Sequence, residues 1–392
     1  MKTNNNIPAY RFQGHTDSWE LRKLNNIADV RDGTHNSPQY IEFGYPLVTS
    51  KNIKNGQVNF EDIQYISSFD YEEINKRSKV NINDILMGMI GTVGNLALVR
   101  EEPEFAIKNV ALIKNIGVVN VEFLYHYLGS YVIEKQLLNS IDGGTQKFIS
   151  LNKIRHLDIT FPTFPEQEAI GTFFSTLDQQ ITLHQRKLDT LKEQKKTYLK
   201  LLFPAKGKTK PALRFQGFED DWEEVKLGEV AEKFDNLRVP ITASKRIAGS
   251  TPYYGANGIQ DYVEGYTHKG EFILIAEDGA NDLKDYPVQY VNGRVWVNNH
   301  AHVIQSVRNL ASNLFLLRAI KTIDIEMYLV GGGRAKLNGD VMMKLPLKLP
   351  SLPEQEAIGT FFQTLDQEIA QVEDKLASLK EMKKTLLRKL FV

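Results

Sequence analysis

Two stretches of the chain place apolar side chains at alternating spacings of four and three residues. This alternation builds one continuous apolar seam on a helix, and more than four heptads of it are typical of a coiled coil. The predicted seam consists of Ile170, Phe174, Leu177, Ile181, Leu188, Leu191, Tyr198 and Leu202 in the first stretch, and of Ile358, Phe362, Leu365, Ile369, Val372, Leu376, Leu379, Leu386 and Leu390 in the second.

Each predicted helix is too long to be buried within its own domain. Pro165 and Pro353 suit a first helical turn, and Pro204 ends the first helix. A helix of ~38 residues is ~57 Å long, which exceeds the diameter of a small domain. We therefore expect the two helices to pack against each other as an antiparallel coiled coil, and the alternative is that each pairs with another subunit.

Two lysines, Lys195 and Lys383, interrupt the seam at equivalent places. A polar group in a coiled-coil core can fix the register of the two helices. The alternative, which we favour, is that both side chains extend out of the seam into water.

The two stretches belong to an internal repeat. Residues 165–182 and 353–370 are identical at fifteen of eighteen positions, with an offset of 188. Residues 11–29 and 214–232 match at ten of nineteen positions, with an offset of 203. The segments between these repeats, 30–142 and 233–330, share little sequence. A period this long indicates a duplicated domain with an appended helix, and divergent middles suggest that the two copies recognise different targets.

The repeat predicts a division of the chain into five segments. Two similar domains, 1–163 and 214–351, each precede a long helix, and a basic linker follows the first helix. The helices span 164–203 and 352–392, and the linker spans 204–213.

Short apolar runs broken by glycine predict strands within each domain. Such runs occur at 81–99, 105–119, 269–282 and 293–307, and a last strand precedes each long helix. Short helices are expected at 121–138 and 309–321. The fold class predicted is α+β, with two similar domains separated by the paired long helices.

Composition narrows the class of protein only a little. The 392 residues include 48 basic and 48 acidic side chains and no cysteine. The missing cysteines exclude a disulfide scaffold and a thiolate zinc site, and a cytoplasmic location is the simplest expectation. We see neither a signal peptide nor an apolar run long enough for a membrane span. A net charge of zero argues weakly against a protein that coats nucleic acid indiscriminately.

Catalytic motifs are missing from the sequence. It contains no phosphate-binding loop of the GxxxxGK[ST] type, no HExxH and no GxSxG. Asp221, Glu224 and Lys226 resemble a nuclease triad, but the other copy of the repeat lacks the two acids, so we interpret the resemblance as accidental. His300 and His302 would face the same side of a predicted strand, where hydrogen bonding is a better interpretation than metal binding. No catalytic residue and no metal site are predicted.

Several predicted loops instead combine amides, hydroxyls, aromatic rings and basic groups. Asn and Gln side chains can pair with adenine, and Arg and Lys with guanine, so these loops are candidates for DNA contact. The candidates in the first half are Thr34, His35, Asn36, Lys51, Lys54, Thr145, Gln146 and Lys147. Those in the second half are Lys245, Arg246, Tyr253, Tyr254, Asn257, Asn298, Asn299, His300, Arg334 and Lys336.

Charge is distributed unevenly along the chain. Residues 195–210 contain six lysines and no acid, whereas both domains are close to neutral. The lysine-rich stretch could contact phosphates, or it could be a solvated helix end and linker. The zero net charge is therefore an average, and we expect the chain alone to bind DNA poorly.

The duplicated PEQEAI openings, the long helices and the variable domains resemble the specificity (S) subunit of type I restriction–modification systems. The stretches DILMGMIGTVGN, PYYGANGIQDY, EFILIAEDGAN and VNNHAHV are similar to this family as well. The resemblance covers the whole chain. It implies two target recognition domains, each reading one part of a bipartite, asymmetric site in double-stranded DNA, and paired helices that set the gap between the parts.

The resemblance also implies partners and cofactors. Two modification (M) subunits would dock on the helices, bind S-adenosylmethionine and methylate adenine. Two restriction (R) subunits, which use ATP and Mg, would join to cleave unmethylated DNA. This chain would then be non-catalytic and carry no cofactor of its own. The alternative function is a coiled-coil scaffold that binds only proteins.

Overall fold

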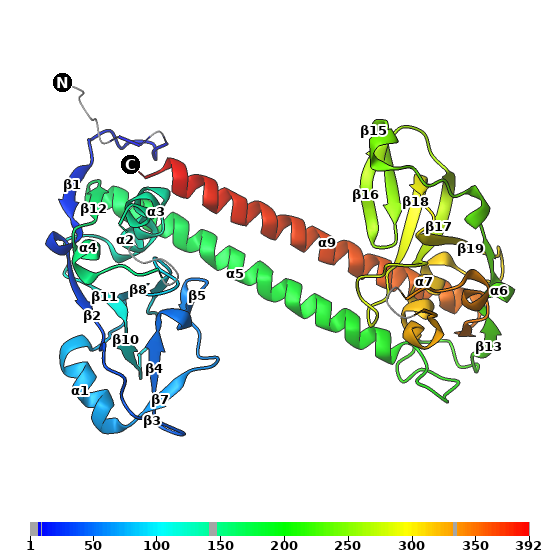
Figure 1. Cartoon of the computed structure of the whole chain (residues 1–392), viewed down its shortest axis with the longest axis horizontal. Helices are drawn as coiled ribbons and strands as arrows, with labels where there is room; N and C mark the ends of the chain where they lie inside the picture. Colours follow the sequence, from blue (N-terminus) through cyan, green and yellow to red (C-terminus); the bar gives the residue numbers. More distant parts are fainter. Residues whose placement is uncertain (1–6, 9, 141–146, 332–334, 392) are drawn as a thin grey trace. The chain divides into compact units, whose positions relative to one another are not determined.

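The computed structural model describes residues 7–8, 10–140, 147–331 and 335–391. The chain forms two compact units, and each contains part of both long helices (Figure 1). Unit 1 comprises Met1–Gln185 and Lys375–Val392, and unit 2 comprises Arg186–Asp374. The units therefore cut across the predicted division into domains and helices.

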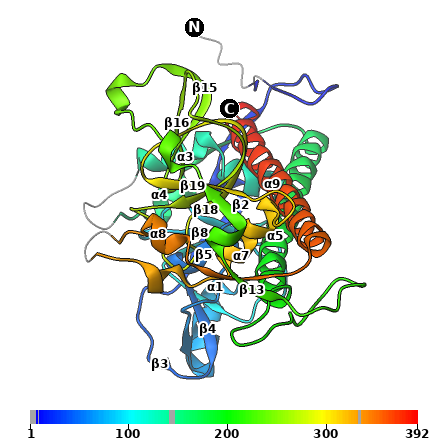
Figure 2. The same ribbon diagram turned by 90° about the vertical axis from the view of Figure 1, so that its right-hand side faces the viewer.

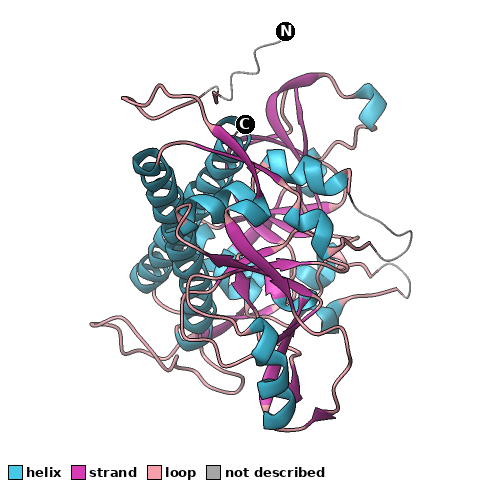
Figure 3. Cartoon of the chain, turned by 90° about the vertical axis from the view of Figure 1, so that its left-hand side faces the viewer, coloured by secondary structure: helices cyan, strands magenta, loops and turns pink. Residues whose placement is uncertain are grey.

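The described part of unit 1 contains two four-stranded sheets, two two-stranded sheets and several short helices in addition to its share of the long ones (Figure 3). Its strands are β1 (Glu20–Lys23), β2 (Ala28–Asp32), β3 (Tyr40–Ile41), β4 (Tyr45–Thr49), β7 (Gln64–Ile66), β8 (Ile85–Gly88), β9 (Leu96–Leu98), β10 (Ala106–Lys108), β11 (Val110–Asn115) and β12 (Asp158–Phe161), with the small pair β5 (Ile53–Lys54) and β6 (Gln57–Val58). Its helices are α1 (Ser68–Ser78), α2 (Val121–Leu128), α3 (Tyr131–Leu138) and α4 (Leu151–Arg155). The sheets have the orders β2-β11-β8-β9, β10-β4-β7-β3 and β1-β12.

Unit 2 is built around one sheet of six strands in the order β14-β19-β17-β18-β15-β16 (Figure 2). These strands are β14 (Ala231–Lys233), β15 (Ala248–Gly255), β16 (Gly258–Val263), β17 (His268–Ala276), β18 (Val288–Val297) and β19 (Ala301–Ser306). A second pair joins β13 (Glu223–Lys226) to β20 (Pro346–Leu349). The short helices are α6 (Leu227–Val230), α7 (Asn313–Lys321) and α8 (Gly339–Met342).

The two units share a three-stranded framework although their middle segments share little sequence. β2-β11-β8 in unit 1 corresponds to β14-β19-β17 in unit 2. The pairing supports this equivalence, because in each unit the middle strand, β11 or β19, pairs antiparallel with both of its neighbours. What differs is the material outside the framework, namely the sheet that contains β3 with α1 in unit 1, and the hairpin β15–β16 in unit 2.

The long helices are α5 (Phe164–Leu201) and α9 (Leu352–Lys389), and they are antiparallel within each unit. In unit 1, Asp178 of α5 contacts Lys383, whereas the later residue Gln185 contacts the earlier residue Lys380. Nearly all predicted seam residues are buried, and only Ile181, Tyr198 and Leu386 are half-buried. The predicted fold class, including the antiparallel helix pair, is confirmed.

The seam lysines form ion pairs with the opposite helix. The ammonium of Lys195 lies 2.6 Å from a carboxylate oxygen of Asp366, and that of Lys383 lies 2.5 Å from Asp178. Their side chains are about one-third and one-quarter exposed, at 34% and 26%. Both lysine side chains thus extend to the edge of the seam, where each ammonium group pairs with a carboxylate of the opposite helix and is partly exposed to water.

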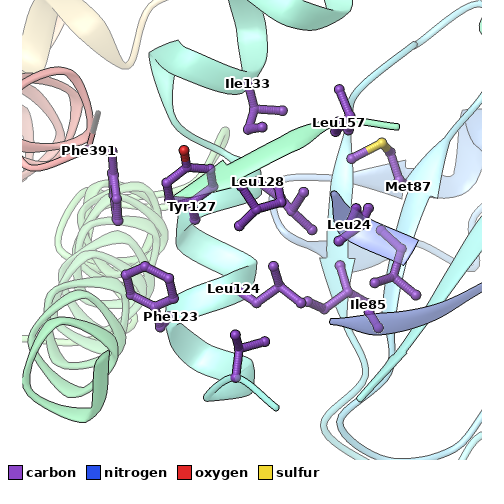
Figure 4. Close-up of a cluster of buried hydrophobic side chains, with 14 of the residues drawn as sticks. Leu24, Ile85, Met87, Phe123, Leu124, Tyr127, Leu128, Ile133, Leu157 and Phe391 are labelled. Carbon is purple, nitrogen blue, oxygen red and sulfur yellow. The ribbon is translucent and has the colours of Figure 1, made fainter. Parts of the chain in front are cut away.

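Equivalent aromatic contacts cover the core of each unit. Phe203, just after α5, packs against Trp222 and Phe315 with ring centroids 5.7 Å and 5.4 Å away. Phe391, just after α9, packs against Trp19 and Phe123 at 6.3 Å and 5.9 Å. Figure 4 shows Phe391 beside Phe123 and Tyr127 in unit 1. Each domain core is therefore completed by a helix that starts in the other half of the sequence.

A buried ion pair ties each repeated RFQG segment to a helix start. The guanidinium of Arg11 donates two hydrogen bonds of 2.7 Å to Glu166, and Arg214 does the same to Glu354. Glu166 is fully buried and Glu354 nearly so. Such two-fold pairing is strong and directional, which explains why the short motif is preserved in both copies.

Two of the predicted short helices need correction. The expected helix 121–138 is two helices, α2 and α3, because Gly129 ends the first and Ser130 precedes the second. The expected helix 309–321 begins only at Asn313, since Asn309 adopts a positive φ of 66° that a right-handed helix cannot contain.

We expect Phe203→Ala and Phe391→Ala each to lower the free energy of unfolding by about 3–5 kcal/mol, because each removes a buried ring from an aromatic cluster. Chemical denaturation followed by near-ultraviolet circular dichroism measures the loss. Met382→Ala, at an exposed position of α9, is the control and should change stability little. A Phe391→Ala protein as stable as the control would show that the ring is not needed for the core.

Candidate nucleic-acid interface

The first group of candidates lies in the loop that follows β2. Thr34, His35 and Asn36 are half-buried or exposed in this loop. The backbone of Thr34 is held on both sides, because its N–H donates to Ile107 O and its carbonyl accepts from Asn109 N–H. These hydrogen bonds hold the backbone of the loop in place, and the loop carries three polar side chains.

The remaining described candidates of unit 1 connect to this loop through shared neighbours. Lys51 and Lys54 are exposed in the segment after β4, next to Ser50. The Ser50 hydroxyl donates to Asn109 O, and its carbonyl accepts from the Thr92 hydroxyl. The neighbouring Gly91 N–H donates to the carbonyl of Lys147. The loops that carry the unit 1 candidates thus form one connected edge.

His35 is exposed, but both of its ring nitrogens have partners. Nδ1 lies 2.8 Å from Asn109 Oδ1, and Nε2 lies 2.8 Å from Asp32 Oδ2. The hydrogen bond to Asn109 and that to Asp32 raise the pKa of His35 above its usual value. The ring therefore exposes its face, while both of its nitrogen atoms are engaged by neighbouring side chains.

In unit 2 a second edge collects five of the predicted residues. The Asn257 amide donates to Gly279 O, and its oxygen accepts from Asn281 N–H. His300 Nδ1 lies 2.5 Å from Asp278 Oδ1, and the Lys336 ammonium lies 2.7 Å from Glu277 Oε1. The predicted residues on this edge are Asn257, Asn298, Asn299, His300 and Lys336.

The two edges occupy the same place in the shared framework. Ile90 forms an isolated bridge with Phe148 in unit 1, and Asp278 forms one with Lys336 in unit 2. Both pairs are related by the offset of 188 found in the repeat. The two units therefore present chemically different side chains at equivalent positions.

A carboxylate network lies behind the unit 2 edge. Arg238 contacts Glu277 at 2.6 Å and Asp235 at 3.5 Å, and His302 Nδ1 contacts Asp235 at 2.6 Å. Burial alone would raise the pKa of Glu277, but Lys336 and Arg238 lower it below its ordinary value. Burial would also raise the pKa of Asp235, but the hydrogen bonds from His302 and from the Val303 N–H lower it below its ordinary value.

Asp235, Glu277 and His302 converge closely enough to suggest a metal site. Arg238 and Lys336 already supply positive charge to these acids, and His302 Nε2 lies 2.9 Å from the carbonyl of Leu337. The arrangement is better described as an ion-pair network that supports the loops. His300 is not part of this group. The prediction that His300 and His302 face the same side of one strand is wrong, because β19 begins only at Ala301, after His300.

Lys245 and Arg246 form a separate basic site beside the hairpin β15–β16. Lys245 is exposed, and the Arg246 guanidinium stacks over the Tyr253 ring at 4.1 Å. Tyr254 is half-buried. Tyr253 is only 1% exposed, and its hydroxyl bonds with the backbone of Ile241.

Burial corrects the prediction at two positions. Direct reading of a base requires an exposed hydrogen-bonding edge. Tyr253 supports Arg246 from below, and Asn298, 4% exposed, accepts the N–H of His300. Both side chains therefore position neighbouring groups. Thr145, Gln146 and Arg334 lie outside the described residues.

Sequence reasoning missed the acids that orient the exposed groups. Asp32, Glu277 and Asp278 hold His35, Lys336 and His300, respectively. It also missed Arg77, which contacts Asp32. One signal was present, because Asp32 and Asp235 are related by the offset of 203 that governs the first repeat. Glu277 and Asp278 follow segments that share little sequence between the two copies, so the repeat gave no signal for them.

The comparisons with known proteins decide the family. Residues 16–193 and 219–381 match the family model of the type I restriction modification DNA specificity domain. The chain belongs to this family. The two matched ranges correspond to the two copies of the repeat, and the family is defined by DNA specificity, which gives no support to a scaffold that binds only proteins.

Relatives of this specificity family match over different lengths. A putative type I restriction enzyme specificity subunit of Haemophilus influenzae is 44% identical over 143 residues, which is 36% of each chain. The MjaX specificity subunit of Methanocaldococcus jannaschii, also a putative type I subunit, is 23% identical over 95% of this chain and 92% of its own. The first match therefore spans little more than a third of that relative.

A solved structure shows the same fold. The S subunit of a type I restriction–modification system from M. genitalium has a TM-score of 0.73, with 18% identity over 98% of this chain and 99% of that one. Among the residues described here, no helix is both long and apolar enough to cross a membrane.

We expect Glu277→Gln to lower the stability of unit 2 by about 1–3 kcal/mol near neutral pH, because Lys336 and Arg238 lose their charged partner. A carboxylate with a lowered folded pKa stabilises the fold above its unfolded pKa, and this contribution is lost as the pH falls through the folded value. The variant should therefore lose less stability than the parent between about pH 5 and pH 3. Thermal melts across this range measure the difference, with exposed Glu326→Gln as the control. Parallel pH profiles for parent and variant would contradict the network.

Proposed function

We propose that this chain is the DNA-reading subunit of a type I restriction–modification complex, in which each unit reads one part of a bipartite, asymmetric site. One observation supports this most directly. The two units share a framework and differ in the side chains that they expose at equivalent edges. A common scaffold with different exposed groups suits two different half-sites.

The paired helices set the gap between the two half-sites. Within each unit the seam is buried or half-buried, and ion pairs between the helices hold one against the other. Affinity is divided between two modest contacts on one body, so neither unit alone should bind DNA tightly. The helices also dock two modification subunits.

Catalysis belongs to the partners in this proposal. The modification subunits bind S-adenosylmethionine and methylate adenine, which they must rotate out of the DNA stack. Two restriction subunits add ATP-dependent cleavage with Mg. The sequence of this chain contains none of the catalytic motifs sought, and the exposed polar groups of both edges suit recognition.

Co-expression of the chain with the modification subunits of its system should methylate one two-part sequence, which methylome sequencing detects. Replacing residues 30–142 by the equivalent segment of a related subunit should change one half-site only. Replacing residues 233–330 is the matched experiment, and it should change the other half-site. A single undivided consensus, or a change in both halves from either exchange, would contradict the assignment of one unit to each half-site.

Lengthening both helices by one heptad should widen the gap by about three base pairs, because seven residues add ~10.5 Å and each base pair ~3.4 Å. The insertions belong after Gln185 and after Asp374, at the boundary between the units, where the contacts within each unit are kept. The same seven residues inserted after Gly207, in the exposed linker, serve as the control. An unchanged gap would show that the helices do not determine spacing.

A further inference from the structure

An open cavity of about 410 Å³ lies in unit 1 between the loop after β2 and helix α1. The loop contributes residues 33–34 and 36–38, and α1 contributes one face that includes Asp70, Glu73 and Arg77. Helix α1 and the sheet that contains β3 are the parts of unit 1 that have no counterpart in the described part of unit 2. The cavity is therefore a place where the two units differ.

Arg77 lines this cavity, and its guanidinium forms an ion pair with Asp32. Its Nη2 contacts Oδ1 of Asp32, and the Arg77 side chain is 65% exposed. The Asp32 side chain is only 8% exposed, and its second oxygen contacts His35. A buried carboxylate thus restricts the orientation of an exposed guanidinium, which reduces the entropy lost when it binds a ligand.

The opposite wall of the cavity is held rigidly as well. Gly33 lies so close to the neighbouring strand that a Cβ atom there would be 2.2 Å from Ile107 O. Its N–H donates to Val110 O at 3.0 Å, and the next N–H, of Thr34, donates to Ile107 O at 3.0 Å. The cavity is therefore formed before any ligand arrives.

The charges around Arg77 select among ligands. Asp70 and Glu73 line the same cavity and would repel a phosphate. A guanine base has two adjacent acceptors, O6 and N7, that match the planar fork of arginine. Carboxylates can accept a hydrogen bond from the N4 amino group of the paired cytosine. The lining therefore suits the edge of a G·C pair.

We propose that Arg77, oriented by Asp32, reads a guanine in the half-site addressed by unit 1; this inference rests on the function proposed above. The described part of unit 2 has a different arrangement at the equivalent place. There Asp235 is followed by Arg238, whose side chain is 15% exposed and engaged by Glu277 and by the carbonyl of Ala301. The two half-sites should therefore differ in their requirement for this guanine.

The test uses the full chain in complex with its modification subunits. Methylome sequencing gives the consensus, and binding to oligonucleotides with each base at the tested position gives the discrimination. Arg77→Ala should reduce discrimination for guanine at one position of one half-site by about 5- to 150-fold, the range of a bidentate contact. Arg77→Lys keeps the charge but loses the fork, and it should relax the same position. Asp32→Asn should relax it partly.

The controls separate base reading from charge and from folding. Lys79→Ala removes a neighbouring exposed cation just after α1, outside the lining of the cavity, and it should leave the consensus unchanged. The half-site read by unit 2 should be unaffected in every variant, which shows that the complex assembles. Because Arg77 is largely exposed, its variants should melt within a few degrees of the parent.

Four outcomes overturn the inference. A uniform loss of affinity for all sequences in Arg77→Ala, restored in Arg77→Lys, would identify a phosphate contact instead. An unchanged consensus, or a parent half-site without guanine, would exclude the contact altogether. A parent complex that methylates no two-part sequence would overturn the proposed function as well, and so the two failures can be told apart.

Discussion

The burial of one apolar seam by two helices holds each unit together. Neither helix could cover its own seam, so each unit takes one stretch of helix from each copy of the repeat. The seam continues directly into the domain cores, because Phe203 and Phe391 end their helices inside aromatic clusters. Loss of the seam would therefore open both cores.

This arrangement separates stability from recognition. Trp19 and Trp222, the Arg–Glu pairs and the rings of Phe203 and Phe391 are alike in both units, and all of them are buried or nearly so. The exposed edges lie in loops next to the framework strands and contribute little to the cores. Their side chains can therefore vary without loss of the fold, which is what a protein needs when its two halves read different targets.

Sequence periodicity predicted the helices well because a four-three pattern repeated over many turns has few other interpretations. The repeat predicted the common ends of the units for a similar reason. The break at Gly129 and the late start of α7 at Asn313 were missed, since single residues decide where short helices end.

The candidate site was predicted less completely than the fold. His35 and Lys336 are exposed, and their contact with DNA stays a prediction. Loop composition could not distinguish buried Tyr253 and Asn298 from exposed neighbours. Composition also could not reveal Asp32 behind Arg77, because 45 residues separate the two along the chain. Such pairs depend on strand and helix placement, which is a property of the tertiary structure.

The contact of Phe391 with Trp19 has a consequence for synthesis. Trp19 leaves the ribosome early, whereas the ring that covers it arrives only after unit 2 has been made. Unit 1 must therefore wait with an open aromatic surface, although domains made first usually fold first. A chain released before Phe391 would expose that surface permanently, which makes it a target for chaperones and proteases.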